Sequence, residues 1–153
     1  LENYVELSRR LLGREEVLVG VVGLEEDGCF YSRIAAEVDS PRLFDLTGKT
    51  RHVLDLVEVF NVCDVLVTSD GGPAHFASIS SIHSVIFFGP ETPALYEPLG
   101  DNHTCLYAGL SCSPCLTAYN HRQTPCDGDN VCVQRFEPAQ VERIVLEKLG
   151  MTS

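Results

Sequence analysis

The chain has 153 residues, 44% of them hydrophobic and 22% charged, which is enough for one ordinary domain. Eleven basic and twenty-two acidic residues give a formal net charge of −11. This acidity argues against a nucleic-acid-binding protein or a polybasic membrane-surface patch, because both rely on Lys and Arg to meet phosphates.

The first third of the chain alternates between helical and strand patterns. Residues 4–12 carry apolar side chains at helical spacing, and Gly13 follows as a stop signal. Residues 17–22 form a continuous β-branched run, which predicts a strand buried on both faces of a parallel sheet. A short helix at 31–38 and a weak strand at 43–46 follow.

The same alternation continues along the rest of the chain. In order, the patterns predict a helix at 53–60, a strand at 65–68, a helix at 73–80, strands at 84–88 and 104–107, a loop at 111–132 and a closing helix at 138–149. Between these elements, Thr92 and Pro93 suit a helix start. We therefore predict a doubly wound α/β domain with a mainly parallel sheet, which binds ligands in the loops beyond the carboxyl ends of its strands.

The loop after the strand at 65–68 has the features of an anion site. Gly71 and Gly72 allow close backbone approach, and Pro73 starts a helix whose N–H groups favour negative charge. His75 lies in the first turn and can donate to a phosphate oxygen. Asp70 fits better as an acceptor for hydroxyl groups. A tight turn with a capping Asp70 and a solvated His75 fits the loop equally well.

Two acidic residues follow the strand at 17–22. A carboxylate beyond a strand end can bind a ribose diol, as in dinucleotide-binding folds, and Glu25 and Glu26 are the candidates. The alternative for this loop is a solvated acidic turn that leads into a helix.

Gly48-Lys49-Thr50 resembles the end of the phosphate-binding P-loop motif. A P-loop also needs a glycine five residues before Gly48, and Leu43 stands there, so the ATPase or kinase interpretation fails. Lys49 remains a possible single-charge contact to a phosphate. Thr50 is a good N-cap for the helix that follows.

Four cysteines crowd into the loop at 111–132. Cys112, Cys115, Cys126 and Cys132 have a spacing that can form a tetrahedral zinc site, with His121 as an alternative ligand. A redox Cys-x2-Cys pair and a purely structural role are the alternatives for this segment.

The other three cysteines stand in apolar or mixed surroundings. We predict that Cys29, Cys63 and Cys105 are small buried hydrophobic residues. Seven cysteines cannot all pair, and the amino terminus shows no signal-peptide pattern, so we expect a reducing compartment. For the same reason we treat the glycosylation sequon at Asn102 as chance.

Three segments together resemble glycosyltransferase family nine, the bacterial heptosyltransferases that build the lipopolysaccharide core. They are TGKT at 47–50, CDVLVTSDGGPAH at 63–75 and FFGPETP at 87–93. The CSPC segment at 112–115 is also similar to one found in many members. The match keeps order and spacing over almost the whole chain. Gly71 and Glu91 depart from the family, which has Thr at both positions.

The resemblance implies one Rossmann-like half of a two-domain GT-B glycosyltransferase. Residues 1–153 would be a single nucleotide-sugar-binding domain, while the acceptor domain and the catalytic base would lie outside this chain, which opens on Leu and would be a piece of a longer protein. By this resemblance, Gly71, Gly72 and His75 would hold the diphosphate, and Asp70 would bind sugar hydroxyls. Glu25 or Glu26 would bind the adenosine ribose, and Lys49 and Thr50 would line the nucleotide cleft.

The implied reaction transfers a heptose or related sugar from a nucleotide sugar such as ADP-heptose to a lipopolysaccharide core or another glycan. No cofactor is expected for catalysis, and zinc would be structural only. The resemblance implies a place in the cytoplasm, with the inner face of the bacterial inner membrane as the alternative. No stretch of the chain approaches the length of a membrane span. Two alternatives are a non-catalytic, metal-stapled nucleotide-binding module and a domain of a GT-B-like sugar-nucleotide epimerase.

Overall fold

The computed structural model describes residues 1–120, 123–124, 126 and 129–151, which form two compact units. Unit 1 comprises Leu1–Leu56 and Glu137–Ile144, and unit 2 comprises Val57–Phe136 and Val145–Ser153. Each unit has its own parallel sheet. Among the described residues, no helix reaches the length and apolar content needed to cross a bilayer.

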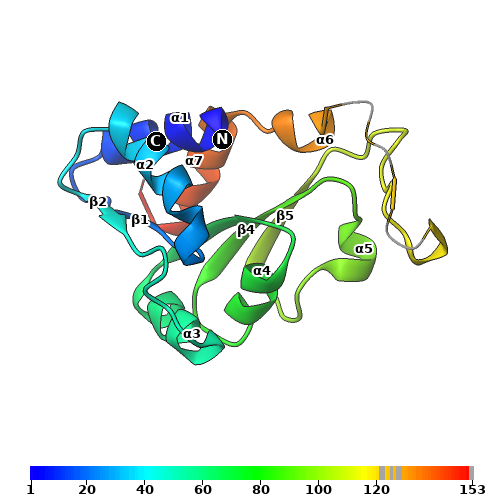
Figure 1. Cartoon of the computed structure of the whole chain (residues 1–153), viewed down its shortest axis with the longest axis horizontal. Helices are drawn as coiled ribbons and strands as arrows, with labels where there is room; N and C mark the ends of the chain where they lie inside the picture. The colour runs from blue at the N-terminus through cyan, green and yellow to red at the C-terminus, as the bar shows by residue number, and fades with distance from the viewer. Residues whose placement is uncertain (121–122, 125, 127–128, 152–153) are drawn as a thin grey trace. The chain divides into compact units, whose positions relative to one another are not determined.

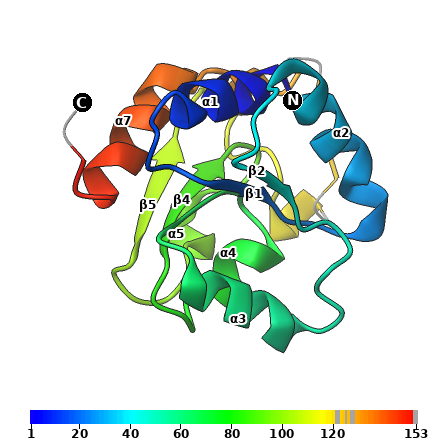
Figure 2. The same cartoon turned by 90° about the vertical axis from the view of Figure 1, so that its left-hand side faces the viewer.

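Unit 1 is built on two parallel strands, which lie side by side (Figure 2). Its elements in order are α1 (Glu2–Leu12), β1 (Val19–Val21), the 3-10 helix η1 (Glu25–Asp27), α2 (Gly28–Glu37), β2 (Leu43–Asp45) and the start of α3 (Val53–Val62). Val19 pairs with Leu43, and Val21 pairs with Asp45. A cluster of buried apolar residues from α1, α2 and β2 forms the core: Val5, Leu12, Ile34, Val38 and Leu43.

Arg42 fixes the end of α1 to the start of β1. Its guanidinium donates to the carbonyl oxygens of Leu12 (2.6 Å) and Val17 (2.9 Å), and also to that of Arg14. These carbonyls lie at and just beyond the end of α1, where a helix leaves its last acceptors without intrahelical partners. The planar fork of one arginine therefore satisfies three carbonyl oxygens along the connection between α1 and β1.

Unit 2 holds a three-stranded parallel sheet in the order β3-β4-β5. β4 and β5 lie side by side in Figure 1. Its elements in order are β3 (Val65–Ser69), α4 (Gly72–Ala77), β4 (His83–Phe88), α5 (Pro93–Tyr96), β5 (His103–Tyr107), the 3-10 helix η2 (Ala118–Asn120), α6 (Val131–Gln134) and the end of α7 (Pro138–Lys148). The central strand β4 is the most deeply buried, with Val85, Ile86 and Phe88 fully inaccessible to solvent. Ala74 of α4 packs on Ile86 and Phe88.

The observed elements confirm the predicted α/β class with parallel strands, and they correct several details. β1 is only three residues long and is partly exposed, so the prediction of a strand buried on both faces was wrong. α2 begins at Gly28 rather than at residue 31, and α4 ends at Ala77. Thr50 is not the N-cap of α3, because the helix begins at Val53. The Asp55 carboxylate instead accepts the N–H groups of Arg51 and His52, which directly precede the helix.

Two of the three isolated cysteines are not core residues. Cys29 is exposed on the first turn of α2, and Cys63 is exposed in the connection between α3 and β3. Connections run over the surface, so an apolar sequence neighbourhood does not bury a residue there. Cys105 of β5 is half-buried.

Candidate functional site

The loop after β3 is held at the carboxyl end of the sheet in unit 2. The Asp70 N–H donates to the Phe87 carbonyl at 2.9 Å, so the loop begins as a continuation of the β3–β4 ladder. Gly71 then adopts φ +157° and ψ −169°, a backbone conformation that is essentially restricted to glycine. A β-carbon at Gly71 would meet nothing within 4 Å, so the backbone at this point is open to a ligand.

α4 starts directly from this loop. Gly71 is the N-cap residue of the helix, so Asp70 does not occupy the N-cap position. Pro73 occupies the first turn, as predicted, and His75 is exposed in the same turn. Asp70 is half-buried. The geometry therefore presents two glycine N–H groups and an imidazole from one short segment.

The two loops of unit 1 lie together at the carboxyl end of its sheet. The Leu46 N–H donates to the Val21 carbonyl and the Gly48 N–H to the Gly23 carbonyl, both at 2.9 Å, which carries the β1–β2 pairing past the strands. Gly48 contacts Glu25. Glu25, Glu26 and Lys49 are exposed, and Thr50 is half-buried.

Asp45 fixes the turn that carries Lys49. Its Oδ1 accepts the Thr47 hydroxyl at 2.6 Å and the Thr47 N–H at 2.9 Å. These two hydrogen bonds hold the pKa of Asp45 below its usual value, and the Lys49 charge acts in the same direction. Asp45 is not among the residues predicted from the sequence, although an Asp two residues before a Thr is a recognisable turn signal.

The eight predicted donor-binding residues thus divide evenly between the units. Four lie at the end of the unit 1 sheet (Glu25, Glu26, Lys49 and Thr50), and four lie at the end of the unit 2 sheet (Asp70, Gly71, Gly72 and His75). Within each unit they gather at the edge where parallel sheets bind ligands. Their roles in donor binding stay predictions.

The cysteine segment is anchored on the turn after β4. The Pro90 carbonyl accepts the N–H groups of Cys115 (2.8 Å) and Leu116 (2.9 Å), and the Ser113 hydroxyl donates to the Gly89 carbonyl. A β-carbon at Gly89 would stand 3.1 Å from the Cys132 sulfur, so the segment packs tightly on this glycine. Glu91, which follows in the same turn, is only 4% exposed.

The four clustered cysteines are free thiols, with Cys115 near the other three. Burial raises the pKa of Cys115, and the neighbouring thiols of Cys126, Cys132 and Cys112 raise it further. A zinc site at these four residues stays a prediction, and His121 lies outside the described residues. Among the described side chains, only Glu97, His103 and Cys105 bring three possible ligand atoms within 4.8 Å of one another.

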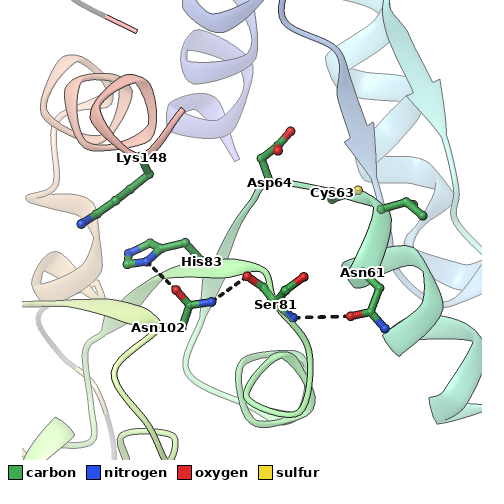
Figure 3. Close-up of a pocket in the computed structure, with 8 residues that line it drawn as sticks. Asn61, Cys63, Asp64, Ser81, His83, Asn102 and Lys148 are labelled. Atoms are coloured by element: carbon green, nitrogen blue, oxygen red, sulfur yellow. Dashed lines mark hydrogen bonds between the residues drawn. The ribbon is translucent and has the colours of Figure 1, made fainter. Parts of the chain in front are cut away.

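A polar cavity of about 430 Å³ lies at the opposite, amino end of the unit 2 strands (Figure 3). A chain of hydrogen bonds crosses it: Asn102 contacts His83 (3.4 Å) and donates to the Ser81 carbonyl (2.7 Å), and the Ser81 N–H donates to Asn61 (3.4 Å). Lys148 also lines it. Because parallel sheets bind ligands at their carboxyl ends, this cavity is not the predicted donor site.

Two lipooligosaccharide heptosyltransferases match parts of this chain. The lipooligosaccharide heptosyltransferase 2 of Campylobacter jejuni serotype O:6 is 25% identical over 103 residues, which cover 67% of this chain and 32% of that protein. Its counterpart in serotype O:2 is 31% identical over 73 residues, 47% of this chain and 23% of that protein. The chain therefore spans about a third or less of these relatives.

Two solved structures share the fold. Escherichia coli ADP-heptose LPS heptosyltransferase II aligns over 96% of this chain and 40% of its own, with a TM-score of 0.74 and 22% identity. A family 9 glycosyl transferase from Veillonella parvula aligns over 97% of this chain and 40% of its own, with a TM-score of 0.78 and 20% identity. Residues 1–124 match the family described as "Glycosyltransferase family 9 (heptosyltransferase)". The chain belongs to glycosyltransferase family 9.

Proposed function

We propose that this chain is the donor-binding half of a glycosyltransferase that takes a heptose, or a related sugar, from a nucleotide sugar such as ADP-heptose. The observation that carries the proposal is the family match over residues 1–124, because it covers the loops that follow β1, β2, β3 and β4. These are the loops in which a parallel sheet binds its ligand.

The loop after β3 suits the diphosphate of such a donor. When the sugar is transferred, the bond between its anomeric carbon and the diphosphate breaks, and negative charge grows on the leaving phosphate oxygens. The N–H groups of Gly71 and Gly72 and the imidazole of His75 are donors that would stabilise this charge. Asp70, which would repel a phosphate, would instead accept hydrogen bonds from sugar hydroxyls.

The loops of unit 1 suit the nucleoside. Glu25 or Glu26 would accept the two hydroxyls of the ribose, while Lys49 and Thr50 would line the nucleotide cleft. With a net charge of −11, the overall field of the chain opposes an anionic donor. Binding would therefore depend on these local donors rather than on long-range attraction.

The acceptor side of the reaction would lie in another part of the protein. The proposed acceptor is a lipopolysaccharide core or another glycan, since the similar proteins of Campylobacter jejuni are named lipooligosaccharide heptosyltransferases. The attacking hydroxyl needs a general base to take its proton as the new bond to the anomeric carbon forms. We assign no residue of this chain to that role, and we expect that the chain alone, incubated with ADP-heptose and acceptor, gives no product.

Calorimetric titration with ADP tests donor binding by this chain. We expect weak binding that His75→Ala reduces about tenfold to a hundredfold, the usual cost of a hydrogen bond to a charged group. His83→Gln is the matched control, because His83 lines the cavity at the opposite end of the same strands. Binding that is lost in His83→Gln and kept in His75→Ala would place the nucleotide in the wrong cavity and overturn the proposal.

A further inference from the structure

Three side chains outside the proposed donor loops form a compact set of possible metal ligands in unit 2. One oxygen of Glu97, one ring nitrogen of His103 and the sulfur of Cys105 all lie within 4.8 Å of one another. Carboxylate, imidazole and thiolate are the three side-chain groups that bind zinc in proteins. None of the three is among the metal ligands predicted from the sequence.

The fold fixes two of these ligands on one strand. His103 and Cys105 are separated by one residue on β5, so their side chains leave the same face of the sheet. In the pairing with β4, His103 stands opposite Ser84 and Cys105 opposite Ile86. Cys105 packs against the buried cluster of Ala74, Ile86 and Phe88, which gives the set an apolar floor.

The third ligand comes from the end of α5, a helix that is fixed at both ends. The Thr92 hydroxyl accepts the Ala94 N–H at 3.3 Å where the helix begins. The Glu97 N–H donates to the Pro93 carbonyl at 3.0 Å where it ends. Glu97 therefore projects its carboxylate from a defined backbone position, even though it lies six residues before His103.

The distance between the carboxylate and the imidazole fits a shared ion better than a direct bond. Glu97 Oε2 and His103 Nε2 are 3.7 Å apart, whereas hydrogen bonds between such atoms are about 2.7–3.2 Å long. Two donors that each lie about 2.1 Å from one tetrahedral ion are separated by about 3.4 Å. Only small side-chain movements would be needed to bring both atoms onto one cation.

Charge and exposure also suit a divalent cation. A thiolate and a carboxylate together carry two negative charges, which balance a dication when the thiol releases its proton on binding. The side chain of His103 is 13% exposed and that of Glu97 is 56% exposed, so the site opens to solvent on the carboxylate side. Three protein ligands with solvent access leave the fourth tetrahedral position to water.

We propose that Glu97, His103 and Cys105 form a three-ligand site for zinc or a similar divalent transition metal, separate from the four-cysteine segment. The soft sulfur and the imidazole select such metals over Mg²⁺ and Ca²⁺, which prefer sites made only of oxygen. The ion would join α5 to β5. This site does not depend on the proposed sugar-donor function.

Cobalt titration of the metal-free chain tests the site, because Co²⁺ bound to a thiolate gives a near-ultraviolet charge-transfer band. We expect Cys105→Ser to remove part of the band and one equivalent of bound Zn²⁺ per chain. Glu97→Gln changes an exposed side chain. We expect it to lower the Zn²⁺ affinity of this site at least about tenfold, since even changes beyond the direct ligands can cost that much affinity. Cys63→Ser replaces an exposed thiol elsewhere in unit 2 and should change neither quantity.

A double variant distinguishes metal bound at the proposed site from metal bound by the four-cysteine segment. In Cys115→Ser/Cys126→Ser, the equivalent that depends on Cys105 should remain, and Glu97→Gln should still weaken it. Circular dichroism of each metal-free variant checks that it folds, and Glu97→Gln tests the site even if Cys105→Ser does not fold. The proposal is overturned if Cys105→Ser and Glu97→Gln bind as much Zn²⁺ as the parent, or if the double variant binds none.

Discussion

Gly48 lies directly against Glu25: a β-carbon added at Gly48 would stand 3.1 Å from Glu25 Cβ and 3.2 Å from its Cα. Gly48 has φ +67°, and its N–H donates to the Gly23 carbonyl at 2.9 Å. One glycine therefore allows the loop after β2 to close on the loop after β1. The proposed ribose-binding and cleft-lining residues of unit 1 owe their proximity to this contact.

We predict that Gly48→Ala destabilises the protein and weakens ADP binding. The left-handed backbone costs an alanine about 1–2 kcal/mol, and the contact with Glu25 adds on the order of 1 kcal/mol. Thermal and urea denaturation measure the loss. Gly109→Ala is the matched control, since Gly109 has a similar φ of +57° but its nearest contact would be an ordinary 3.9 Å. Equal losses in the two variants would contradict a specific role for the Gly48–Glu25 contact.

The Asp45–Thr47 turn gives a pH-dependent prediction. Since Thr47 lowers the pKa of Asp45 in the folded state, the stability that Asp45 contributes is present above its ordinary pKa, near 4, and is lost as the pH falls through its folded value. Thr47→Val removes the hydroxyl donor, so the melting temperature should depend less on pH between 5 and 2.5 and the pKa of Asp45, followed by NMR, should rise. Thr50→Val, on the same loop, is the control, and an unchanged pKa in Thr47→Val would contradict the prediction.

The sequence predicted the three strands of unit 2 well because runs of β-branched and aromatic residues mark them, whereas β1 is shorter and more exposed than predicted. Residues 65–68, 84–88 and 104–107 each match an observed strand to within one residue at either end. The helix ends were harder to predict. α2 begins at Gly28 because a 3-10 turn at Glu25–Asp27 leads directly into it, and glycine at the first position of a helix gives no pattern signal.

Side-chain environments were the part that the sequence could not supply. Cys29, Cys63 and Cys105 all stand in apolar or mixed sequence surroundings, yet two are exposed and one is half-buried. Likewise, Glu97 meets His103 and Cys105 only because α5 and the turn after it return the chain to the edge of β4. Such contacts depend on the path of the chain in three dimensions, which local sequence patterns do not encode.

His83 provides a second pH-dependent prediction, at neutral rather than acid pH. Burial lowers the pKa of His83, and the charges of Lys148 and His103 act in the same direction, while Asn102 and Glu147 oppose them. A histidine with a lowered folded pKa stabilises the fold fully above its ordinary value of about 6.5, and this stability is lost as the pH falls below it. We expect a melting temperature that drops between pH 7.5 and 5.5.

Replacing His83 should remove this dependence. His83→Gln keeps a polar group near Thr104, whose hydroxyl lies 2.8 Å from His83 Nε2, but it does not titrate. The melting temperature of His83→Gln should therefore change less between pH 7.5 and 5.5 than that of the parent. His52→Gln, at an exposed histidine, should behave like the parent. If both variants retain the full pH dependence, the titrating group lies elsewhere.

The seven thiols should be alkylated at different rates, and the alkylation rate of Cys105 should depend most steeply on pH. Burial, assisted by the charges of Glu97 and Asp70, raises the pKa of Cys105 to about 11. Only the thiolate reacts with iodoacetamide, so with metal removed by EDTA the alkylation rate of Cys105 should rise about tenfold per pH unit from 7.5 to 9.5. Mass spectrometry follows each cysteine separately.

Glu97→Gln should increase the alkylation rate of Cys105, because removing a neighbouring negative charge lowers the pKa of the thiol. Asp101→Asn, a neutralising change at an exposed residue nearby in sequence, is the control and should leave the rate unchanged. Cys29, which is exposed, should be modified well before Cys105 at pH 7.5 in every variant. An alkylation rate for Cys105 that levels off near pH 8.5 would show that its thiol is neither buried nor influenced by Glu97 in the way that the structure indicates.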